Sequence, residues 1–499
     1  LEKIITLDIS SANIKLGVLS ENLELLYTMK KPICVQNDDI DGFAKSFDMN
    51  YLWNSIKELL NIAINKIQQQ NDTLIGISTC AQRIATVFLD ETGELIYGGP
   101  NIDVRGIDSA YLIDDVFTEE RFFNITAHSP SIMFSLSRLL WFKEEREDLY
   151  EKIGKMLMLD DWIVYKLTGK QVTDYTSIGA SQLFNIRKKK WSTEIIETFD
   201  IDRNILPEIT QSGQIIGDLK PVLKTKWDIK NQDVPVIKSG GDTQASLLGM
   251  GVIDEYDLGI SLGTTAPLHL VLNKPILDPN LNFWTTFHSI EGKYLLEANA
   301  GDTGTAYNWF LKTFLSEISP QTYTLVENHL NETEPGCSLF TFLGPELMHF
   351  RDQSTISRGV FVFEPPTLIG DRLPTLKNFT RSVLENIGFG ILLNFKALKE
   401  FSDNEIKTYI GGGMAKSTAF SQMLSNILNS RIKSPKYKDT AFIGSAMNVL
   451  LGTKRYSDYR SIIENLVEFQ VFEPNVSRVK KYARVFHEWD NLKNKVDDL

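Results

Sequence analysis

A short pattern at the start of the chain returns near its middle. At both places an apolar strand leads into a turn of small polar residues and then into a second apolar strand, over residues 4–20 and again over residues 257–271. Such a repeat constrains the fold, because two copies of one strand–turn–strand unit predict two similar halves. We therefore expect one domain over residues 1–245 and another over residues 246–499. The match is short, and coincidence is the alternative.

The segments between these hairpins alternate between strand and helix patterns. Residues 48–68 carry apolar side chains at helical spacing, with Asp48 as the expected N-cap, and strands are expected at residues 74–78 and 85–89. Mixed strands and helices in this order predict an α/β fold. A chain of 499 residues with 42% hydrophobic residues is long enough to bury two sizeable cores.

Charge and cysteine content exclude several classes of protein. Lys and Arg number 52 against 64 Asp and Glu, a net charge of −12, and the one tight basic run is Arg187–Lys190, so no nucleic-acid partner is expected. No apolar run reaches the ~18 residues of a membrane span. The cysteines, Cys34, Cys80 and Cys337, form neither a metal-ligand spacing nor a disulfide framework, which favours a reducing compartment and predicts a cytoplasmic enzyme.

The polar turns of the two hairpins are candidate phosphate-binding sites. Backbone N–H groups and hydroxyls in such a turn can point at a phosphate, and in Gly263-Thr264-Thr265 the glycine permits a close approach. An ordinary tight hairpin is the alternative. The first turn follows Asp8, a strand-end carboxylate that could orient a hydrated Mg²⁺, with a plain turn residue as the alternative.

A strand at residues 234–237 is followed by Lys238-Ser-Gly-Gly-Asp242 and an apolar helix. This order places the carboxylate of Asp242 at a helix N-terminus beside flexible backbone, where a base could meet a substrate hydroxyl. A helix N-cap is the alternative.

A second glycine run, Gly411–Gly413, lies between a strand and a helix. It is not a P-loop, because Ala415 rather than glycine precedes Lys416. A turn on which a nucleotide base lies flat against the backbone is one interpretation, and a tight strand-to-helix turn is the other.

Polar residues that could hydrogen-bond sugar hydroxyls follow two of the expected strands. Gln82 and Arg83 come after the strand at residues 74–78, and Asp103 and Arg105 lie in Gly99–Gly106. For the second pair, a surface ion pair is the alternative.

Taken together, these segments resemble the FGGY family of carbohydrate kinases along essentially the whole chain. Met133–Glu145 is similar to the first signature of the family, with Arg138 where lysine is usual, and Tyr409–Ser417 is similar to its adenosine motif. Further similar segments are Leu167–Gly169, Asp174–Thr176, Trp191 and Asp439–Ala446, the last with Asp439 where glutamate is common.

The resemblance implies two actin-like (ribonuclease H-like) domains with a central cleft, the first binding the sugar and the second the nucleotide. It implies ATP-dependent phosphorylation of a sugar hydroxyl, with Asp242 as the catalytic base and Asp8 orienting Mg²⁺. The implied sugar-binding residues are Gln82, Arg83, Asp103, Arg105 and Asp242. The implied ATP-binding residues are Ser10, Ser11, Lys15, Gly263, Thr264, Thr265, Gly304, Gly411, Gly412, Gly413 and Ser417. Members of the family are often dimers, so a homodimer is expected from the resemblance alone.

One departure from the family pattern lies in the first phosphate turn. The family has Asp-x-Gly-Thr, whereas this chain has Asp8-Ile9-Ser10-Ser11, and the Cβ of Ser10 occupies space that glycine would leave to the phosphate. A catalytically silent regulator that binds sugar and nucleotide on the same scaffold is therefore the alternative to a kinase.

The substrate is expected to be a ketose such as xylulose, or a related open-chain polyol. Asn101–Arg105, Gly241–Gly249 and Tyr323–Glu327 are closer to xylulose kinase-like and autoinducer-2 kinase-like members than to glycerol kinases. Ile84 and Ile102 stand where glycerol kinases have glutamate and tryptophan. Autoinducer-2 and glycerol are the alternatives.

Overall fold

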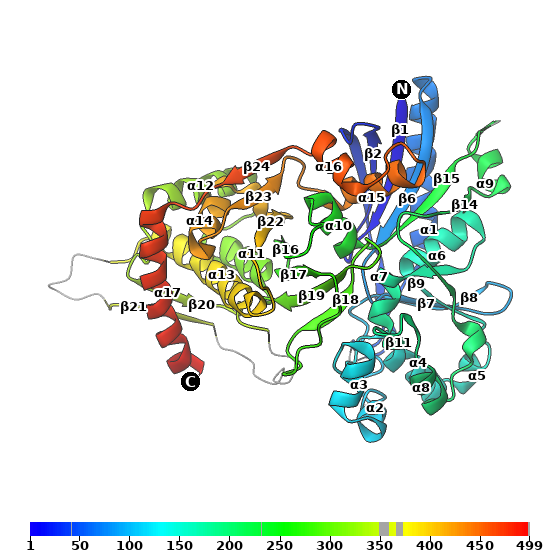
Figure 1. Ribbon diagram of the computed structural model, residues 1–499, viewed down its shortest axis with the longest axis horizontal. Helices are drawn as coiled ribbons and strands as arrows, with labels where there is room; N and C mark the ends of the chain where they lie inside the picture. Colours follow the sequence, from blue (N-terminus) through cyan, green and yellow to red (C-terminus); the bar gives the residue numbers. More distant parts are fainter. Residues whose placement is uncertain (41, 231, 349–358, 366–372, 498–499) are drawn as a thin grey trace. The chain divides into compact units, whose positions relative to one another are not determined.

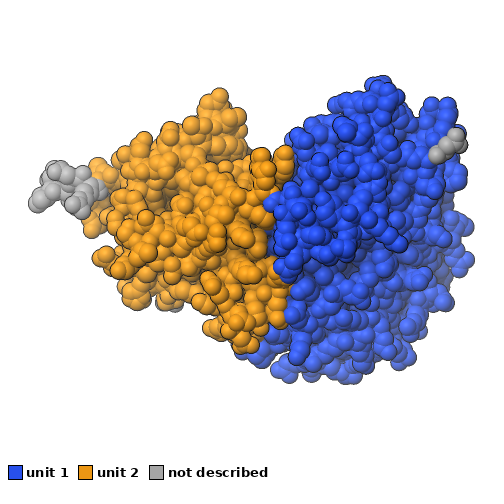
Figure 2. Space-filling model, turned by 45° about the horizontal axis from the view of Figure 1, so that its top comes forward, with its two compact units in different colours: residues 1–253, 272–295, 439–467 blue, residues 254–271, 296–438, 468–499 orange. Residues whose placement is uncertain are grey.

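The computed structural model describes residues 1–40, 42–230, 232–348, 359–365 and 373–497. The chain folds into two compact units, coloured separately in Figure 2. The first unit contains residues 1–253, 272–295 and 439–467, and the second contains residues 254–271, 296–438 and 468–499. Each unit is therefore assembled from segments that are distant in the sequence.

The first unit is built on a six-stranded sheet with the order β14-β15-β6-β1-β2-β3 (Figure 1). β1 is antiparallel to β2 and parallel to β6, and β6 is parallel to β15. Because the carboxyl ends of parallel strands meet at one edge, the segments that follow β1, β6 and β15 lie together there. The bounds are β1 Glu2–Ile9, β2 Asn13–Ser20, β3 Leu25–Pro32, β6 Thr73–Ala81, β14 Ile215–Asp218 and β15 Pro235–Gly241.

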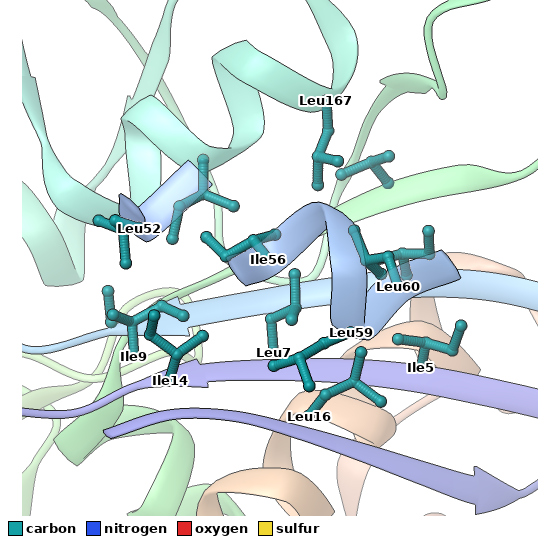
Figure 3. Packing of buried hydrophobic residues seen from close by; sticks show 14 of the residues in the cluster. Ile5, Leu7, Ile9, Ile14, Leu16, Leu52, Ile56, Leu59, Leu60 and Leu167 are labelled. Carbon is teal, nitrogen blue, oxygen red and sulfur yellow. The ribbon is translucent and has the colours of Figure 1, made fainter. Parts of the chain in front are cut away.

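Helices cover both faces of this sheet. On one face α1 (Met49–Gln69), whose predicted N-cap Asp48 accepts a hydrogen bond from Tyr51 N at 2.8 Å, packs with α6 (Leu159–Thr168) on the strands. Figure 3 shows this core, in which leucines and isoleucines of β1 and β2 meet α1. On the other face lie α10 (Asp242–Met250) and α15 (Thr440–Gly452). Burial on both faces explains why β1 is almost continuously apolar.

Smaller elements complete the first unit. A three-stranded sheet has the order β8-β7-β9, with β7 Thr86–Leu89, β8 Leu95–Gly99 and β9 Lys155–Met158, and α4 Ser135–Glu145 packs beside it. The others are β4 Val35–Asn37, β5 Lys45–Phe47, α2 Tyr111–Val116, α3 Glu119–Thr126, α5 Glu147–Tyr150, β10 Val172–Asp174, α7 Tyr175–Ile178, β11 Phe184–Asn185, β12 Lys190–Trp191, α8 Thr193–Thr198, β13 Glu208–Thr210, α9 Pro221–Lys226 and α16 Tyr459–Leu466.

A seven-stranded sheet has the order β18-β19-β17-β16-β22-β23-β24. β16 is antiparallel to β17 and parallel to β22, which repeats the relation of β1 to β2 and β6 and confirms the two similar strand–turn–strand hairpins. The bounds are β16 Asp257–Ser261, β17 Pro267–Leu272, β18 Trp284–Phe287, β19 Tyr294–Asn299, β22 Lys407–Gly411, β23 Ile432–Pro435 and β24 Phe469–Phe472.

Helices also pack around this second sheet. They are α11 Thr303–Phe314, α12 Pro320–Glu332, α13 Leu376–Lys399, α14 Thr418–Leu428 and α17 Val476–Asp497, and a small sheet pairs β20 Leu339–Phe342 with β21 Val360–Phe363. Within the described ranges, none of the helices has the length and apolar character to cross a membrane.

Candidate active site

Three strand ends of the first sheet bring the predicted catalytic carboxylates to one edge. Asp8 lies near the end of β1 and is the register partner of Cys80 on β6, which is in turn the partner of Gly240 on β15. Asp242 follows β15 directly and is the first residue of α10. The sequence placed each carboxylate at a strand end, and the parallel pairing brings the two strand ends together.

Asp8 is a buried carboxylate with an unused oxygen. Its Oδ2 accepts a hydrogen bond from Lys15 Nζ at 3.1 Å across the β1–β2 hairpin. Its Oδ1 is buried and has no hydrogen-bond partner among the described residues. Burial raises the pKa of Asp8, although the Lys15 ammonium opposes this. A buried carboxylate oxygen with free lone pairs is a suitable ligand for a hard cation such as Mg²⁺.

Asp242 has the environment of a general base. Its Oδ1 accepts a hydrogen bond from Thr243 N at 2.7 Å. Burial raises the pKa of Asp242 to about 6, with a further increase from the negative charge of Asp8 and an opposing effect of Arg83. A carboxylate with a pKa just below neutrality is ionised at pH 7 and still accepts a proton readily.

The backbone leading into Asp242 is fixed by a short hydrogen-bonded chain. Gly241 N donates to Thr176 Oγ1 at 3.0 Å, and this hydroxyl donates to Asp174 Oδ1 at 2.9 Å. Gly240 has a φ of +73°, and a Cβ on it would lie 1.9 Å from Thr176 Oγ1. Glycine is therefore required at position 240 by both conformation and space.

A cluster of buried charged residues lies around Lys238, at the start of the segment that leads into Asp242. It was not predicted as part of a site. Lys238 is fully buried and its Nζ contacts Asp160, lies 2.5 Å from Asp161 Oδ1 and 3.9 Å from Asp174 Oδ1. Burial lowers the pKa of Lys238 and raises those of Asp161 and Asp174. The signal available in the sequence was a lysine inside an apolar strand four residues before Asp242.

The side chain of Gln82 hydrogen-bonds two of the predicted segments, the first polar turn and the loop after β8. Its side-chain Oε1 accepts from Asn101 N at 3.3 Å, and its Nε2 donates to Ser10 O at 3.4 Å. It therefore ties the first polar turn to the loop that contains Asp103. Arg83 lies beside Gly241, the residue before Asp242, because a Cβ on Gly241 would be 3.0 Å from Arg83 Cγ, and its charge opposes the rise in the pKa of Asp242.

Asp103 and Arg105 form an ion pair that is buried, not at the surface. Asp103 accepts from Lys45 N at 2.7 Å, from Arg105 Nε at 2.8 Å and from the Tyr97 hydroxyl. Arg105 also donates to Asp38 Oδ2 at 2.6 Å. Protein donors thus occupy both oxygens of Asp103, and contact of this pair with a sugar stays a prediction.

The first polar turn accommodates serine without strain. None of residues 9–14 has a positive φ. Ser10 Oγ donates to Asn13 O at 3.2 Å and accepts from Asn13 N at 3.3 Å, which closes the turn, while Ser11 is exposed. The backbone of this turn therefore does not need the glycine that the family pattern has there.

In the second unit the two predicted nucleotide segments lie side by side. β16 and β22 are parallel neighbours, Leu262 N donates to Gly411 O at 2.8 Å, and Met414 N donates to Leu262 O at 3.2 Å. Gly263, Thr264 and Gly413 are exposed beside this junction. Gly412 has a φ of +94°, and a Cβ on it would lie 2.6 Å from Leu262 O. Glycine at 412 therefore permits the close contact between the two turns.

Two further predicted residues have structural roles at this edge. Gly304 is buried in the first turn of α11, and its N donates to Thr264 O at 2.9 Å. A Cβ on Gly304 would lie 2.1 Å from Gly263 O. Ser417 is the N-cap of α14, and its Oγ accepts from Phe420 N at 3.0 Å. Thr265 is half-buried in the turn.

The FGGY family models match both halves of the chain. The model for the N-terminal domain of the FGGY family of carbohydrate kinases matches residues 3–249, and the model for its C-terminal domain matches residues 258–451. The chain belongs to this family. It is thus a carbohydrate kinase, and kinases of this family use ATP as co-substrate.

Relatives and solved structures agree with the family assignment. YoaC of Bacillus subtilis (strain 168), named provisionally as a sugar kinase, is 26% identical over 448 residues, 88% of each chain. The autoinducer-2 kinase of Photorhabdus laumondii is 22% identical over 91% of this chain and 87% of its own length.

Xylulose kinase from Lactobacillus acidophilus superimposes with a TM-score of 0.87 at 20% identity, covering 99% of this chain and 98% of its own. Glycerol kinase from Plasmodium falciparum, solved with ADP, gives a TM-score of 0.85 at 21% identity, covering 99% and 98%. These likenesses confirm the predicted fold class of two actin-like domains.

Proposed function

We propose that this FGGY kinase transfers the γ-phosphoryl group of ATP to a hydroxyl of a ketose such as xylulose, or of a related open-chain polyol, with Asp242 as the general base. The observation that carries the proposal is Asp242 itself, a half-buried carboxylate at the start of α10 with a pKa raised to about 6. We further propose that sugar binds in residues 1–245 and nucleotide in residues 246–499.

The reaction needs a base because an alcohol is a poor nucleophile. As the hydroxyl oxygen bonds to the γ-phosphorus and the bond from that phosphorus to the β–γ bridging oxygen breaks, Asp242 accepts the hydroxyl proton and ADP leaves. Arg83, beside Gly241, is placed to hydrogen-bond the sugar near this carboxylate. The proton thus moves from the reacting oxygen to the carboxylate of Asp242.

The carboxylate of Asp8 is the proposed ligand of Mg²⁺, directly or through water. The fit rests on its buried Oδ1, which has no partner in the described part of the chain. When bound, Mg²⁺ would neutralise charge on the phosphate oxygens. Lys15, 3.1 Å from Asp8 Oδ2, is a second positive charge for the transferring group.

The second unit is proposed to bind the nucleotide through backbone and hydroxyl groups. Gly263 and Thr264 are exposed in the β16–β17 turn and suit phosphate oxygens. Gly413 has no atom within 4 Å of where a Cβ would stand, which leaves its backbone open to a flat base. Gly412 permits the contact between these two turns, and Gly304 lets α11 pack on the first of them.

Autoinducer-2 is the second candidate substrate. Seven of the relatives are autoinducer-2 kinases, at 22–23% identity over 89–91% of this chain. Identity at this level is compatible with either substrate.

A coupled ADP-release assay with Mg-ATP tests both, using xylulose, ribulose, other ketoses, pentitols, glycerol and the autoinducer-2 precursor. We expect sugar-dependent ADP release with one ketose or polyol, and its loss in Asp242→Asn with ATP binding retained. Asp90→Asn, in the turn between β7 and β8, is the matched control and should behave as wild type, because an asparagine Oδ1 can keep the hydrogen bonds from Thr92 and Glu94. ATP binding without sugar-dependent release on any compound would favour the silent regulator, and loss of ATP binding in Asp242→Asn would place Asp242 in the nucleotide site.

A further inference from the structure

Ile84 has a backbone conformation that isoleucine rarely adopts. Its φ is +73°, and among the described non-glycine residues with a positive φ it is the only one branched at Cβ. The left-handed region is a genuine outlier for a β-branched residue, because the side chain crowds the backbone there. Such outliers persist only where the surroundings hold them, and they gather at functional sites.

Two buried side chains hold the carbonyl group of Ile84. Arg138 Nη1 donates to Ile84 O at 3.0 Å, and Thr86 Oγ1 donates to the same oxygen at 3.0 Å. Both Arg138 and Thr86 are fully buried. The carbonyl is therefore fixed from two directions, and it cannot rotate to relieve the strain without losing both hydrogen bonds.

Arg138 also fixes the neighbouring loop. Its Nε donates to Asp103 O at 3.1 Å and its Nη2 donates to Pro100 O at 2.8 Å. The planar guanidinium thus joins three backbone carbonyls from two loops in one rigid geometry, which a lysine ammonium does not reproduce. These loops follow β6 and β8 and contain Gln82, Arg83 and Asp103.

The residue directly before Ile84 is Arg83, which packs on Gly241, next to Asp242. The stem of Arg83 packs on Gly241, and the charge of Arg83 opposes the rise in the pKa of Asp242. Because the left-handed residue sets the direction of the chain at this turn, rotation at Ile84 would swing the peptide that carries Arg83. The conformation of Ile84 therefore sets the direction in which the side chain of Arg83 leaves the backbone.

We propose that Arg138 and Thr86 are positioning residues for the sugar, which hold Ile84 in its strained conformation and thereby keep Arg83 beside Asp242. The inference rests on the proposed function, in which Arg83 and Asp242 face the sugar. The proposal makes a specific prediction. Arg138 and Thr86 are needed because residue 84 is an isoleucine, whereas a glycine at this position adopts the same φ without strain.

A double-mutant cycle tests this prediction with the ketose that the wild-type enzyme phosphorylates. Thr86→Val, which keeps the shape and removes the hydroxyl, should raise the KM for that sugar about tenfold and leave the KM for ATP within about twofold. In the Ile84→Gly background the same substitution should raise the sugar KM by less than about twofold, because glycine needs no clamp.

Two further variants keep the test decisive. Arg138→Lys should also raise the sugar KM in the wild-type background and raise it less in the Ile84→Gly background. It replaces Thr86→Val in the double-mutant cycle if that variant fails to fold. Thr126→Val removes a buried hydroxyl that donates to Phe122 O at 3.1 Å in α3, and it should change thermal stability alone. Equal rises of the sugar KM in both backgrounds, parallel rises for sugar and ATP, or no rise at all would overturn the inference. A wild-type enzyme that phosphorylates no compound would instead count against the proposed function.

Discussion

The hairpin of β1 and β2 carries a pair of charged side chains on the strand ends beside its turn, whereas residues 261–266, which include the turn between β16 and β17, carry none. In the first, Asp8 and Lys15 are register partners that pair at 3.1 Å across the hairpin. In the second, residues 261–266 include no ionisable side chain and expose Gly263 and Thr264. The two hairpins share their strand pairing, so a repeated backbone can present different chemistry at each copy.

The difference follows from what each turn is proposed to bind. Buried charges act strongly on a reacting group because the surroundings screen them little. Uncharged N–H donors act only at contact distance, so the second turn depends on close packing by Gly304 and Gly412. The first turn is thus suited to charge stabilisation during transfer, and the second to holding the nucleotide.

Substituting one polar residue in each hairpin should give the largest difference in kinetic effect between the two hairpins. Asp8→Asn should lower kcat about 10³-fold, because it removes the charge that would bind Mg²⁺ and support the transferring group. Thr264→Val should cost only about 1 kcal/mol of ATP binding, because it removes one hydroxyl from a set of backbone donors. Steady-state kinetics with varied ATP and varied Mg²⁺ measures both.

Raising Mg²⁺ provides the internal control for this pair. The Mg²⁺ concentration that gives half-maximal activity should rise far more in Asp8→Asn than in Thr264→Val. Similar losses of kcat in the two variants would show that the turns share one kind of chemistry and would remove the contrast.

Two glycines of the second unit give the next largest effect. In Gly304→Ala the new Cβ would stand 2.1 Å from Gly263 O, a backbone atom, so we expect a loss of about 2 kcal/mol in stability and weaker ATP binding. In Gly263→Ala the nearest atom is Thr265 O at 3.7 Å, and stability should change little. Urea unfolding and nucleotide titration compare them, and equal destabilisation would mean that packing on Gly263 O does not shape this turn.

Much of the fold could be predicted because its signals are local. The apolar strands that end at Asp8 and lead into Asp242, and the helical spacing of residues 48–68, all correspond to elements of the structure. Both hairpins were visible as a repeat. Pairing of β1 with β6 and of β6 with β15 was not visible, because contacts between strands distant in the chain leave no periodic signal.

The supporting residues of the site escaped prediction for the same reason. The link from Asp174 through Thr176 to Gly241 spans more than 60 residues, and it appears only after folding. The strain at Ile84 depends on Arg138, on a different element. The Cβ of Ser10 was expected to take space from the phosphate, and this stays a prediction. The negative φ of Ser10 and its bonds to Asn13 show only that the turn itself accepts serine.

The pH dependence of kcat/KM should change with a substitution beside the first turn and not with one in the second. The proposed mechanism needs Asp242 ionised, so kcat/KM should fall as the pH drops through about 6 and be about tenfold lower at pH 5 than at pH 7. Asp8→Asn removes a negative charge that raises the pKa of Asp242. In this variant the acidic limb of the profile, where kcat/KM falls with falling pH, should move to lower pH. Thr264→Val should leave the limb in place. A limb unmoved in Asp8→Asn would mean that the two carboxylates do not interact.

The smallest effect is expected where the first turn departs from its family. Ser10→Gly restores the family residue but should not improve nucleotide binding, because no residue of this turn has a positive φ and glycine relieves no strain. It should instead cost about 1 kcal/mol of stability, because the two hydrogen bonds between Ser10 Oγ and Asn13 are lost and the unfolded chain gains freedom. Thermal unfolding and the KM for ATP check both parts. A KM for ATP that falls about tenfold would show that the Cβ of Ser10 does hold the phosphate away, and that close approach matters in the first turn as it does in the second.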